Sequence, residues 1–462
     1  MTAITDALAR WGAMKSTDLY AKIKDEVGSQ RTFERTLRDT PGLLRLGSTR
    51  SRTYALRRPD VPPAEIRMRN EKGEEFIIGN LLGLEAGQWA FDHATWAKPW
   101  MQIGYQGEGT LPIYQGLPWF MEAFRPAGFL GKAWVRQHAE AHGWSLDVQS
   151  WTDDQVLLAA TQEPWDWRGN LSVGPFAEVA ANRVTPATRN GEYARLADLV
   201  MEGVTVGASA DGEQPKFTAL VEEPDMEPRA VIVKFTDRLT GDPAARRWAD
   251  VMVTEAVASQ VMALHGLDTA RTEVWIHGDR LWLETTRFDR VGTIGRCGMV
   301  SLRALAASFN YQGPTGGWVG AVEHLVRRGV LDTPALPQAQ HLATIGHLLL
   351  NNDMHMGNLS FIVGDGWPFP LTIAPVYDMT PMHWIPSIKT RVVPALKREP
   401  VYGTTDTQAM TIVAEIWEET SHREMATAEW RAWAADRAEQ IRARMAGSLS
   451  SLVLDGLHSP KA

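Results

Sequence analysis

The spacing of hydrophobic residues changes along this chain and divides it into segments. Helical spacing marks three short stretches near the N-terminus and returns over residues 317–351 and 408–455. Strand-like apolar runs lie between them, at residues 43–58, 73–85 and 216–236 among others. This pattern favours an α+β fold with a small helical module in front and a helical region behind.

The first 58 residues predict a winged helix-turn-helix. Apolar residues at helical spacing give three helices, and we expect Ser16 or Thr17 to cap the second and Ser29 to cap the third. Two strand-like runs then form a basic hairpin. The helix over residues 30–39 would enter the major groove of DNA, while the hairpin would meet phosphates. The basic residues expected to contact DNA are Arg31, Arg35 and Arg38 in the helix and Arg50 and Arg52 in the hairpin.

The distribution of charge supports an anionic partner for this module. Residues 1–58 hold 12 Lys and Arg against 6 Asp and Glu, whereas the remainder of the chain holds 35 against 49. A basic module on an acidic body suggests nucleic acid first. A winged helix that contacts another protein remains the alternative.

Prolines and tryptophans characterise the segment that follows. Three prolines between residues 59 and 63 mark a linker over residues 59–66, because proline stiffens the chain and discourages regular structure. The tryptophans beyond it, Trp119 and Trp134 among them, are not interleaved with basic residues. We therefore expect them in a hydrophobic core rather than on a base-stacking surface.

A lysine within a β-branched run is the first sign of a nucleotide site. Lys234 lies in residues 230–236, where a buried charge costs free energy unless another charge meets it. A nucleotide phosphate can meet it, as at the third-strand lysine of kinases. Taken alone, the run fits an edge-strand lysine facing water equally well. The next helix has an apolar stripe between residues 253 and 264, and Glu255 beside it is a candidate partner for Lys234.

Residues 347–361, HLLLNNDMHMGNLSF, carry the candidate chemistry. Phosphoryl transfer from a nucleotide needs a carboxylate that orients the acceptor hydroxyl and oxygen ligands that hold Mg²⁺ on the phosphates. Asp353 fits the first role, and Asn358, five residues later, fits the second together with Asp378 at the end of another apolar run. His355 completes the catalytic set, where we expect it to brace the loop rather than transfer protons. A plain polar turn is the alternative, since Asn, Asp and Gly are common in turns.

The cysteine content and the absence of long apolar runs narrow the classes of protein to which the chain can belong. The single cysteine, Cys297, excludes an internal disulfide and a multi-cysteine zinc site, and it fits a reducing cytoplasm. The N-terminus lacks the apolar stretch of a signal peptide, and no apolar run approaches the ~20 residues of a membrane span. We therefore expect a cytoplasmic protein without a membrane partner.

The segments DMHMGNLSF and APVYDMTPM resemble the catalytic and metal-binding segments of the HipA-family serine/threonine kinases, which are toxins of bacterial toxin–antitoxin pairs. The most similar branch is the YjjJ type, which carries its own N-terminal winged helix. The resemblance extends over nearly the whole chain, most specifically over residues 200–385. It implies a bilobal protein-kinase-like fold that uses ATP and Mg²⁺ to phosphorylate a Ser or Thr of a protein.

The loop between Gly207 and Gly212 is similar to the phosphate loop of this family, in which a serine is autophosphorylated and the loop is then expelled. Ser209 stands where the family has that serine, and Lys216 stands where it has the loop lysine. The resemblance therefore implies that Ser209, Gly212 and Lys216 lie at the nucleotide phosphates and that Ser209 is modified. Without the resemblance a plain hairpin is the better interpretation, because no GK[ST] ends the loop.

The segment TRFDR resembles the ERFDR signature that supplies the adenine hinge in this family. Thr286 stands where the family often has Glu, so the resemblance implies adenine binding through the backbone of Thr286 to Phe288. It also implies that Lys234 contacts the nucleotide phosphates and that Glu255 is the glutamate of the adjacent helix.

These expectations combine into one organisation. The predicted units are a winged helix-turn-helix at 1–58, a linker at 59–66, a HipA-type N-terminal subdomain at 67–190, small-lobe elements at 191–290 and a helical large lobe at 291–462. Two alternatives stay open. The first is a DNA-binding transcription regulator whose kinase body is a vestigial sensor. The second is a metal-dependent hydrolase, although a second His at ligand spacing is lacking and oxygen ligands suit Mg²⁺ better. The phosphorylated target and a separate antitoxin are left unspecified.

Overall fold

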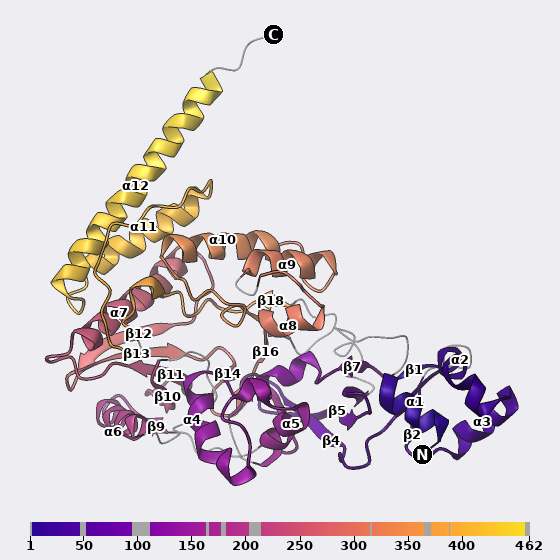
Figure 1. Cartoon of the computed structure of the whole chain (residues 1–462). Helices are drawn as coiled ribbons and strands as arrows, with labels where there is room; N and C mark the ends of the chain where they lie inside the picture. The colour runs from indigo at the N-terminus through magenta and orange to yellow at the C-terminus, as the bar shows by residue number, and fades with distance from the viewer. Residues whose placement is uncertain are drawn as a thin grey trace.

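The computed structural model describes residues 2–46, 52–94, 111–162, 166–176, 182–202, 214–314, 317–364, 371–387 and 389–457. A small N-terminal module lies at one end of the molecule, a middle sheet domain follows, and a larger body ends in the projecting helix α12 (Figure 1). Within the described ranges, no helix combines the length and the apolar character that crossing a membrane requires.

The N-terminal module contains the three helices and the hairpin that the sequence predicts. Its elements are α1 (Ala3–Trp11), β1 (Met14–Lys15), α2 (Ser16–Val27), α3 (Gln30–Asp39), β2 (Leu43–Leu46) and β3 (Thr53–Leu56), with strand order β1-β3-β2. Ser29 caps α3 as predicted, since its side chain accepts from the Thr32 N–H. The predicted cap of α2 is wrong. Strand β1 pairs with β3 up to Lys15, so α2 begins directly at Ser16 without a side-chain cap.

The middle domain is a five-stranded antiparallel sheet with helices beside it. The sheet has the order β7-β6-β5-β4-β8, and the N-terminal hairpin packs on it through Leu46 and Ala55. Trp119 and Trp134 are buried in the core as expected. Strand β4 begins at Ala64, inside the predicted linker. The elements are β4 (Ala64–Arg69), β5 (Glu75–Gly83), β6 (Gln88–His93), β7 (Ile113–Gln115), η2 (Trp119–Phe124), α4 (Gly128–His138), η3 (Glu140–His142), η4 (Val148–Ser150), α5 (Asp153–Gln162) and β8 (Leu171–Val173).

A second five-stranded sheet, with the order β12-β13-β11-β10-β9, forms the small lobe. Trp282 packs with α6, whereas its neighbours Leu281 and Leu283 belong to the core that contains α7. Because successive side chains of a strand face opposite ways, α6 and α7 cover opposite faces of this sheet (Figure 1). The elements are β9 (Arg183–Val184), α6 (Arg189–Met201), β10 (Lys216–Val221), β11 (Arg229–Phe235), α7 (Pro243–Leu264), β12 (Thr272–His277), β13 (Arg280–Thr286), β14 (Arg290–Val291) and β15 (Gly295–Arg296).

Helix α7 differs from the one-sided helix that its apolar stripe predicted. Leu264, placed on the apolar side, is 86% exposed, whereas Asp250, Thr254 and Glu255 are buried. The reason is that α7 lies between the small-lobe sheet and helix α11, so nearly all of its surface is covered. A helix covered on all sides does not follow a single stripe.

The large lobe consists mainly of helices around a small three-stranded sheet, β16-β17-β18. The helical segments predicted over residues 317–351 and 408–455 are confirmed. The elements are β16 (Gly298–Ser301), α8 (Leu302–Ser308), α9 (Trp318–Arg327), α10 (Ala335–Leu348), β17 (Ser360–Val363), β18 (Thr372–Ile373), η5 (Met382–Trp384), α11 (Thr407–Ser421) and α12 (Ala428–Leu457). The segment between α10 and β17 carries the candidate chemistry and lines a common cavity with Lys216 and Lys234 of the small-lobe sheet.

Candidate active site

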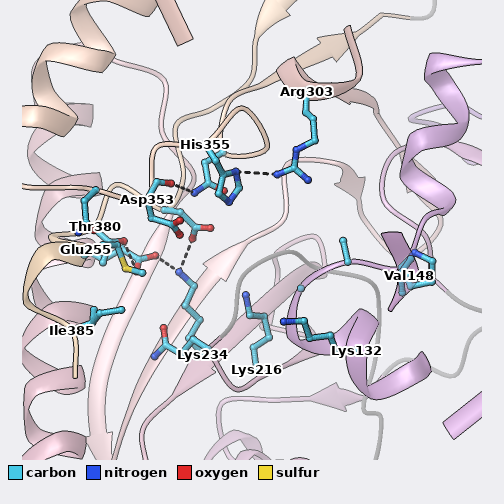
Figure 2. A pocket seen from close by; sticks show the side chains of 18 of the residues that line it. Lys132, Val148, Lys216, Lys234, Glu255, Arg303, Asp353, His355, Thr380 and Ile385 are labelled. Carbon is cyan, nitrogen blue, oxygen red and sulfur yellow. Dashed lines mark hydrogen bonds and ion pairs between the residues drawn. The ribbon is translucent and has the colours of Figure 1, made fainter. Parts of the chain in front are cut away.

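A cavity of about 810 Å³ lies where three parts of the chain meet. The small lobe contributes Lys216, Lys234 and Glu255, and the large lobe contributes the 353–358 loop and Asp378. The middle domain forms another part of the wall through the start of α4 and residues 146–149. The cavity is therefore a cleft between the two lobes with the middle domain on one side (Figure 2).

Lys234 connects the two lobes at the centre of this cleft. It lies on β11, an inner strand of the small-lobe sheet, and is only 7% exposed. Its Nζ lies 2.6 Å from Oε1 of Glu255 and 2.6 Å from Oδ1 of Asp378 (Figure 2). Thr380 donates to the second oxygen of Glu255 at 3.0 Å. The edge-strand alternative for Lys234 is therefore excluded, and the predicted Lys234–Glu255 pair is present.

The charges of this cluster stabilise one another against burial. Burial alone would lower the pKa of Lys234, but Asp378 and Glu255 raise it above its ordinary value. Burial would likewise raise the pKa of Asp378, but the charges of Lys234 and Lys216 and the hydrogen bond from Lys234 hold it below its ordinary value. Asp378 is thus kept as a carboxylate at the edge of the cavity.

The 353–358 loop is held by backbone and amide hydrogen bonds. The side-chain NH₂ of Asn358 donates to the carbonyl oxygen of Asp353 at 2.8 Å, which directs the amide oxygen of Asn358 away from the loop. Asn351 accepts from the Asp353 N–H at 3.1 Å and donates to the Asp378 carbonyl at 3.2 Å. Asn351 therefore joins the loop to the Asp378 segment, a role that the sequence did not reveal beyond a pair of asparagines before Asp353.

The surroundings of Asp378 differ from the prediction. The apolar run before it was expected to be a strand ending at Asp378, but β18 covers only Thr372–Ile373. Asp378 itself has φ +53°, a left-handed conformation that is uncommon outside glycine. This turn brings the carboxylate back toward Lys234. Backbone strain of this kind is concentrated at functional sites.

His355 contacts the large lobe rather than the small lobe. Its Nδ1 lies 3.0 Å from the backbone N of Gly357 and 3.2 Å from Nη2 of Arg303 on α8. Its carbonyl oxygen accepts from the indole of Trp318 at 2.9 Å. These bonds agree with the bracing role expected for His355. Arg303 and Trp318 were not predicted, because they lie far from the loop in sequence.

A smaller hollow of about 100 Å³ lies on the other side of Lys234. Both Thr286 and Phe288 line it, together with apolar side chains that include Ile232, Ala270 and Met299. Lys216 and Lys234 border both this hollow and the main cavity. An apolar hollow that opens beside a charged cavity matches the division of a nucleotide into a base and phosphates.

Oxygen ligands are available for a divalent cation. Lys234 uses Oδ1 of Asp378, which leaves Oδ2 for a further partner, and the amide oxygen of Asn358 faces away from its own loop. In the ranges that the structure describes, no group of three or more His, Cys, Asp and Glu residues is placed to hold a metal. A carboxylate and an amide that share the metal with substrate phosphates and water fit Mg²⁺, which seldom takes a full protein cage.

Comparison with known proteins places the chain in a family. Residues 62–185 match the family described as "YjjJ-like toxin, middle domain", and residues 208–452 match "HipA-like C-terminal domain". The chain belongs to the HipA-like toxins. Toxin YjjJ of Escherichia coli (strain K12) is 31% identical over 401 residues, which cover 84% of each chain. The expected family is thereby confirmed.

The structure of a HipA protein shows the same fold. The Shewanella oneidensis MR-1 HipA, described in complex with HipB and its operator DNA, has a TM-score of 0.50 at 16% identity, covering 83% of this chain and 96% of that one. The Helicobacter pylori proinflammatory kinase CtkA has a TM-score of 0.37 at 10% identity, covering 54% of this chain and 94% of that one. The HipA match confirms the α+β, HipA-like fold class.

Of the remaining predicted residues of this HipA-like chain, Lys216 lies at the cleft, and the others lie away from it or outside the described residues. Arg31, Arg35 and Arg38 are exposed on α3, and Arg52 is half-buried directly before β3. Ser209, Gly212 and Arg50 lie outside the described residues. Lys216, predicted as a loop lysine, is the first residue of β10 and lies in register opposite Lys234.

Proposed function

We propose that this chain is a toxin kinase that transfers the γ-phosphoryl group of ATP, with Mg²⁺, to a Ser or Thr of a protein. One observation carries the proposal. Lys234 is bonded to both Glu255 and Asp378 in a cavity that also contains Asp353 and Asn358. A strand lysine paired with a helix glutamate, a loop Asp followed five residues later by Asn, and a further metal-binding Asp are the parts that kinases use.

Each residue takes a role that its contacts allow. Asp353, at the cavity wall, orients the acceptor hydroxyl and accepts its proton. The amide oxygen of Asn358 and the second oxygen of Asp378 would hold Mg²⁺, which supplies charge neutralisation at the phosphates when it is bound. Lys234 and Lys216 attract the phosphates. The hollow beside Phe288 receives the adenine, and the backbone of Thr286 to Phe288 meets its edge.

We further propose that Ser209 is autophosphorylated and that this modification limits the activity. The added phosphate carries roughly −1.5 to −2 charge at neutral pH, which would oppose the nucleotide phosphates near Lys216. A Ser209→Asp variant should bind ATP weakly, and phosphate should be absent from Ser209 when Asp353 is replaced by Asn. Unchanged ATP affinity in Ser209→Asp would refute the self-limiting mechanism and leave the kinase proposal in place.

The N-terminal module is proposed to be a winged helix that binds DNA. Its element order, with exposed arginines along α3, supports this role. The HipA relative is described with HipB and operator DNA. In this chain the module itself would contact DNA, and a separate antitoxin would be an additional partner. We propose a cytoplasmic location, where ATP, DNA and protein acceptors are all present.

One experiment tests the kinase function. Purified full-length protein is incubated with γ-labelled ATP and Mg²⁺, and the labelled residue is mapped by mass spectrometry. Label on Ser or Thr of the chain or of an added cytoplasmic protein fraction is expected, and it should be lost in Asp353→Asn and on chelation of Mg²⁺. Nucleotide binding without any transfer to protein would favour the alternative of a DNA-binding sensor.

A further inference from the structure

Two hydrogen-bond donors meet the same nitrogen of His355. The backbone N–H of Gly357 lies 3.0 Å from Nδ1. The guanidinium of Arg303 lies 3.2 Å from the same atom (Figure 2). A backbone amide and a guanidinium can only donate, because neither has an acceptor nitrogen and arginine keeps its proton in proteins. Nδ1 is therefore the acceptor. In a neutral imidazole the remaining proton must then be on Nε2.

The surrounding chain is built around this arrangement. Arg303 also donates its backbone N–H to the Met356 carbonyl at 3.0 Å, so the start of α8 is fixed to the loop at two points. Gly357 leaves the space that the pair occupies. A Cβ at this position would lie 2.6 Å from Nη2 of Arg303 and 2.9 Å from Nδ1 of His355. Any side chain at residue 357 would therefore displace the guanidinium or the imidazole.

The other edge of the imidazole remains available for a ligand. His355 lines the main cavity together with Asp353 and Asn358, and no described residue accepts a hydrogen bond from its Nε2. A proton on Nε2 makes His355 a donor, so it cannot take the proton of an acceptor hydroxyl at that atom. Asp353 is then the group that does so.

We infer that Arg303 is a positioning residue that fixes His355 as a neutral Nε2–H donor to a phosphoryl oxygen in the cavity. The identity of that ligand rests on the proposed kinase function. A donor aimed at the phosphoryl group stabilises the charge that its oxygens carry during transfer.

The tautomer is tested without any activity measurement. Full-length protein labelled with ¹⁵N-histidine is recorded at neutral pH in two-bond ¹H–¹⁵N spectra, and the His355 signals are assigned by their loss in His355→Gln. We expect an unprotonated Nδ1 and a protonated Nε2 in the wild type. In Arg303→Met the Nδ1 signal should move toward a mixture of the two tautomers. A protonated Nδ1 in the wild type would overturn the inference.

Kinetics then test the role in transfer. His355→Ala should lower kcat by about 10²-fold, the loss typical of one transition-state donor, whereas His355→Gln should retain more activity because its amide can donate from a similar place. Arg303→Met should lower kcat by roughly tenfold, as removal of a residue that orients an active-site ligand does. Arg303→Lys, which keeps a donor, should recover part of this loss. Affinity for ADP, measured by calorimetry, should stay within about twofold throughout.

The outcomes separate the two proposals. If Arg303→Met changes neither the tautomer nor kcat, Arg303 has no positioning role and the kinase proposal is untouched. If no phosphoryl transfer occurs in any variant, the kinase proposal fails, and the spectra alone still decide the tautomer. Gly357→Ala is a second way to displace the pair without altering either side chain. It should reproduce the Arg303→Met spectrum if its thermal unfolding is unchanged.

Discussion

Two buried ion clusters in this molecule differ in how completely their charged groups are hydrogen-bonded by the protein itself. The cleft cluster consists of Lys234, Glu255 and Asp378. The hinge cluster lies where the middle domain meets the segment after β13, and it consists of Asp166, Arg287, Asp289, Arg290 and Arg296. The first has one cation for two carboxylates, and the second has three guanidiniums for two carboxylates. Within these residues each cluster has an excess of one charge, of opposite sign, and Lys216 adds a positive charge beside the cleft cluster.

The hinge cluster meets its excess charge with protein. Both oxygens of Asp289 bind Arg287, and one also accepts the Gly169 N–H at 2.9 Å. Arg290 and Arg296 donate to the carbonyls of Trp167 and Gly169 as well as to Asp166. In the cleft cluster, by contrast, Asp378 keeps an oxygen at the edge of a cavity. A saturated cluster holds domains together, whereas an unsaturated one beside a cavity has capacity for a ligand.

The comparison predicts that substitutions in the cleft reduce activity more than stability, and that substitutions in the hinge cluster do the reverse. The loss of activity from the cleft should be the largest of these effects. Asp353→Asn is nearly isosteric and lies beside the cleft cluster. It should lower phosphoryl transfer by ~10²–10⁴-fold, the usual loss for a general base, with no change in the melting temperature. The rate of phosphoryl transfer is measured with labelled ATP, and the melting temperature is measured by circular dichroism. Wild-type autophosphorylation by Asp353→Asn would show that the base lies elsewhere.

In the hinge cluster we expect the opposite result, a loss of stability with little loss of activity. Asp166→Asn removes one of two carboxylates and leaves three guanidiniums facing one another, so unfolding should become easier by ~3–5 kcal/mol. Activity per folded molecule should change little at a temperature where the variant is folded. Denaturant titration gives the free energy of unfolding. Asp378→Asn is the matched control, since it should lose activity with a smaller loss of stability because Lys234 keeps Glu255.

Acid should weaken the hinge cluster in a defined range of pH. Burial alone would raise the pKa of Asp166, but Arg290, Arg287 and Arg296 lower it far below its ordinary value of 3.8. A carboxylate with a depressed pKa in the folded state stabilises the protein fully above its unfolded-state pKa, and this contribution is lost as the pH falls toward the folded-state pKa. The stability difference between wild type and Asp166→Asn should therefore be constant from pH 7 to about 5 and shrink below about 4. A difference that grows on acidification would contradict this assignment.

Whether a feature could be predicted from the sequence depends on how far apart its interacting residues lie along the chain. Asp353 and Asn358 lie in one short loop whose spacing is visible in the sequence, and Lys234 is conspicuous because a charge interrupts an apolar run. The pairing of Lys234 with Asp378 bridges 144 positions, and the contact of Arg303 with His355 bridges 52. No local pattern encodes such contacts. The motif therefore identified residues that line the cleft, whereas their contacts with Asp378 and Arg303 required the fold.

The absence of long-range contacts from local sequence patterns also explains the predictions that were wrong. Helix α7 was predicted from an apolar stripe, but it is buried from both sides, so even Glu255 and Asp250 are enclosed. The turn at Asp378 was predicted as a strand end, although the carboxylate reaches Lys234 only through a left-handed residue. The hinge cluster was missed because Asp166 lies more than a hundred residues before the arginines that it binds.

The smallest expected effect concerns a third charged region, the exposed arginines of α3, which unlike both clusters have water as their main surroundings. Exposed charges act on DNA mainly by releasing counterions from phosphates, so each contact should add about one unit to the slope of log affinity against log salt. Full-length Arg31→Ala/Arg35→Ala should bind duplex DNA with a shallower slope and weaker sequence preference. Arg10→Ala, an exposed arginine on α1 of the same module, is the matched control and should leave the slope unchanged. Equal slopes for all three proteins in fluorescence anisotropy would show that α3 does not meet DNA and would favour a protein-contact role for this module.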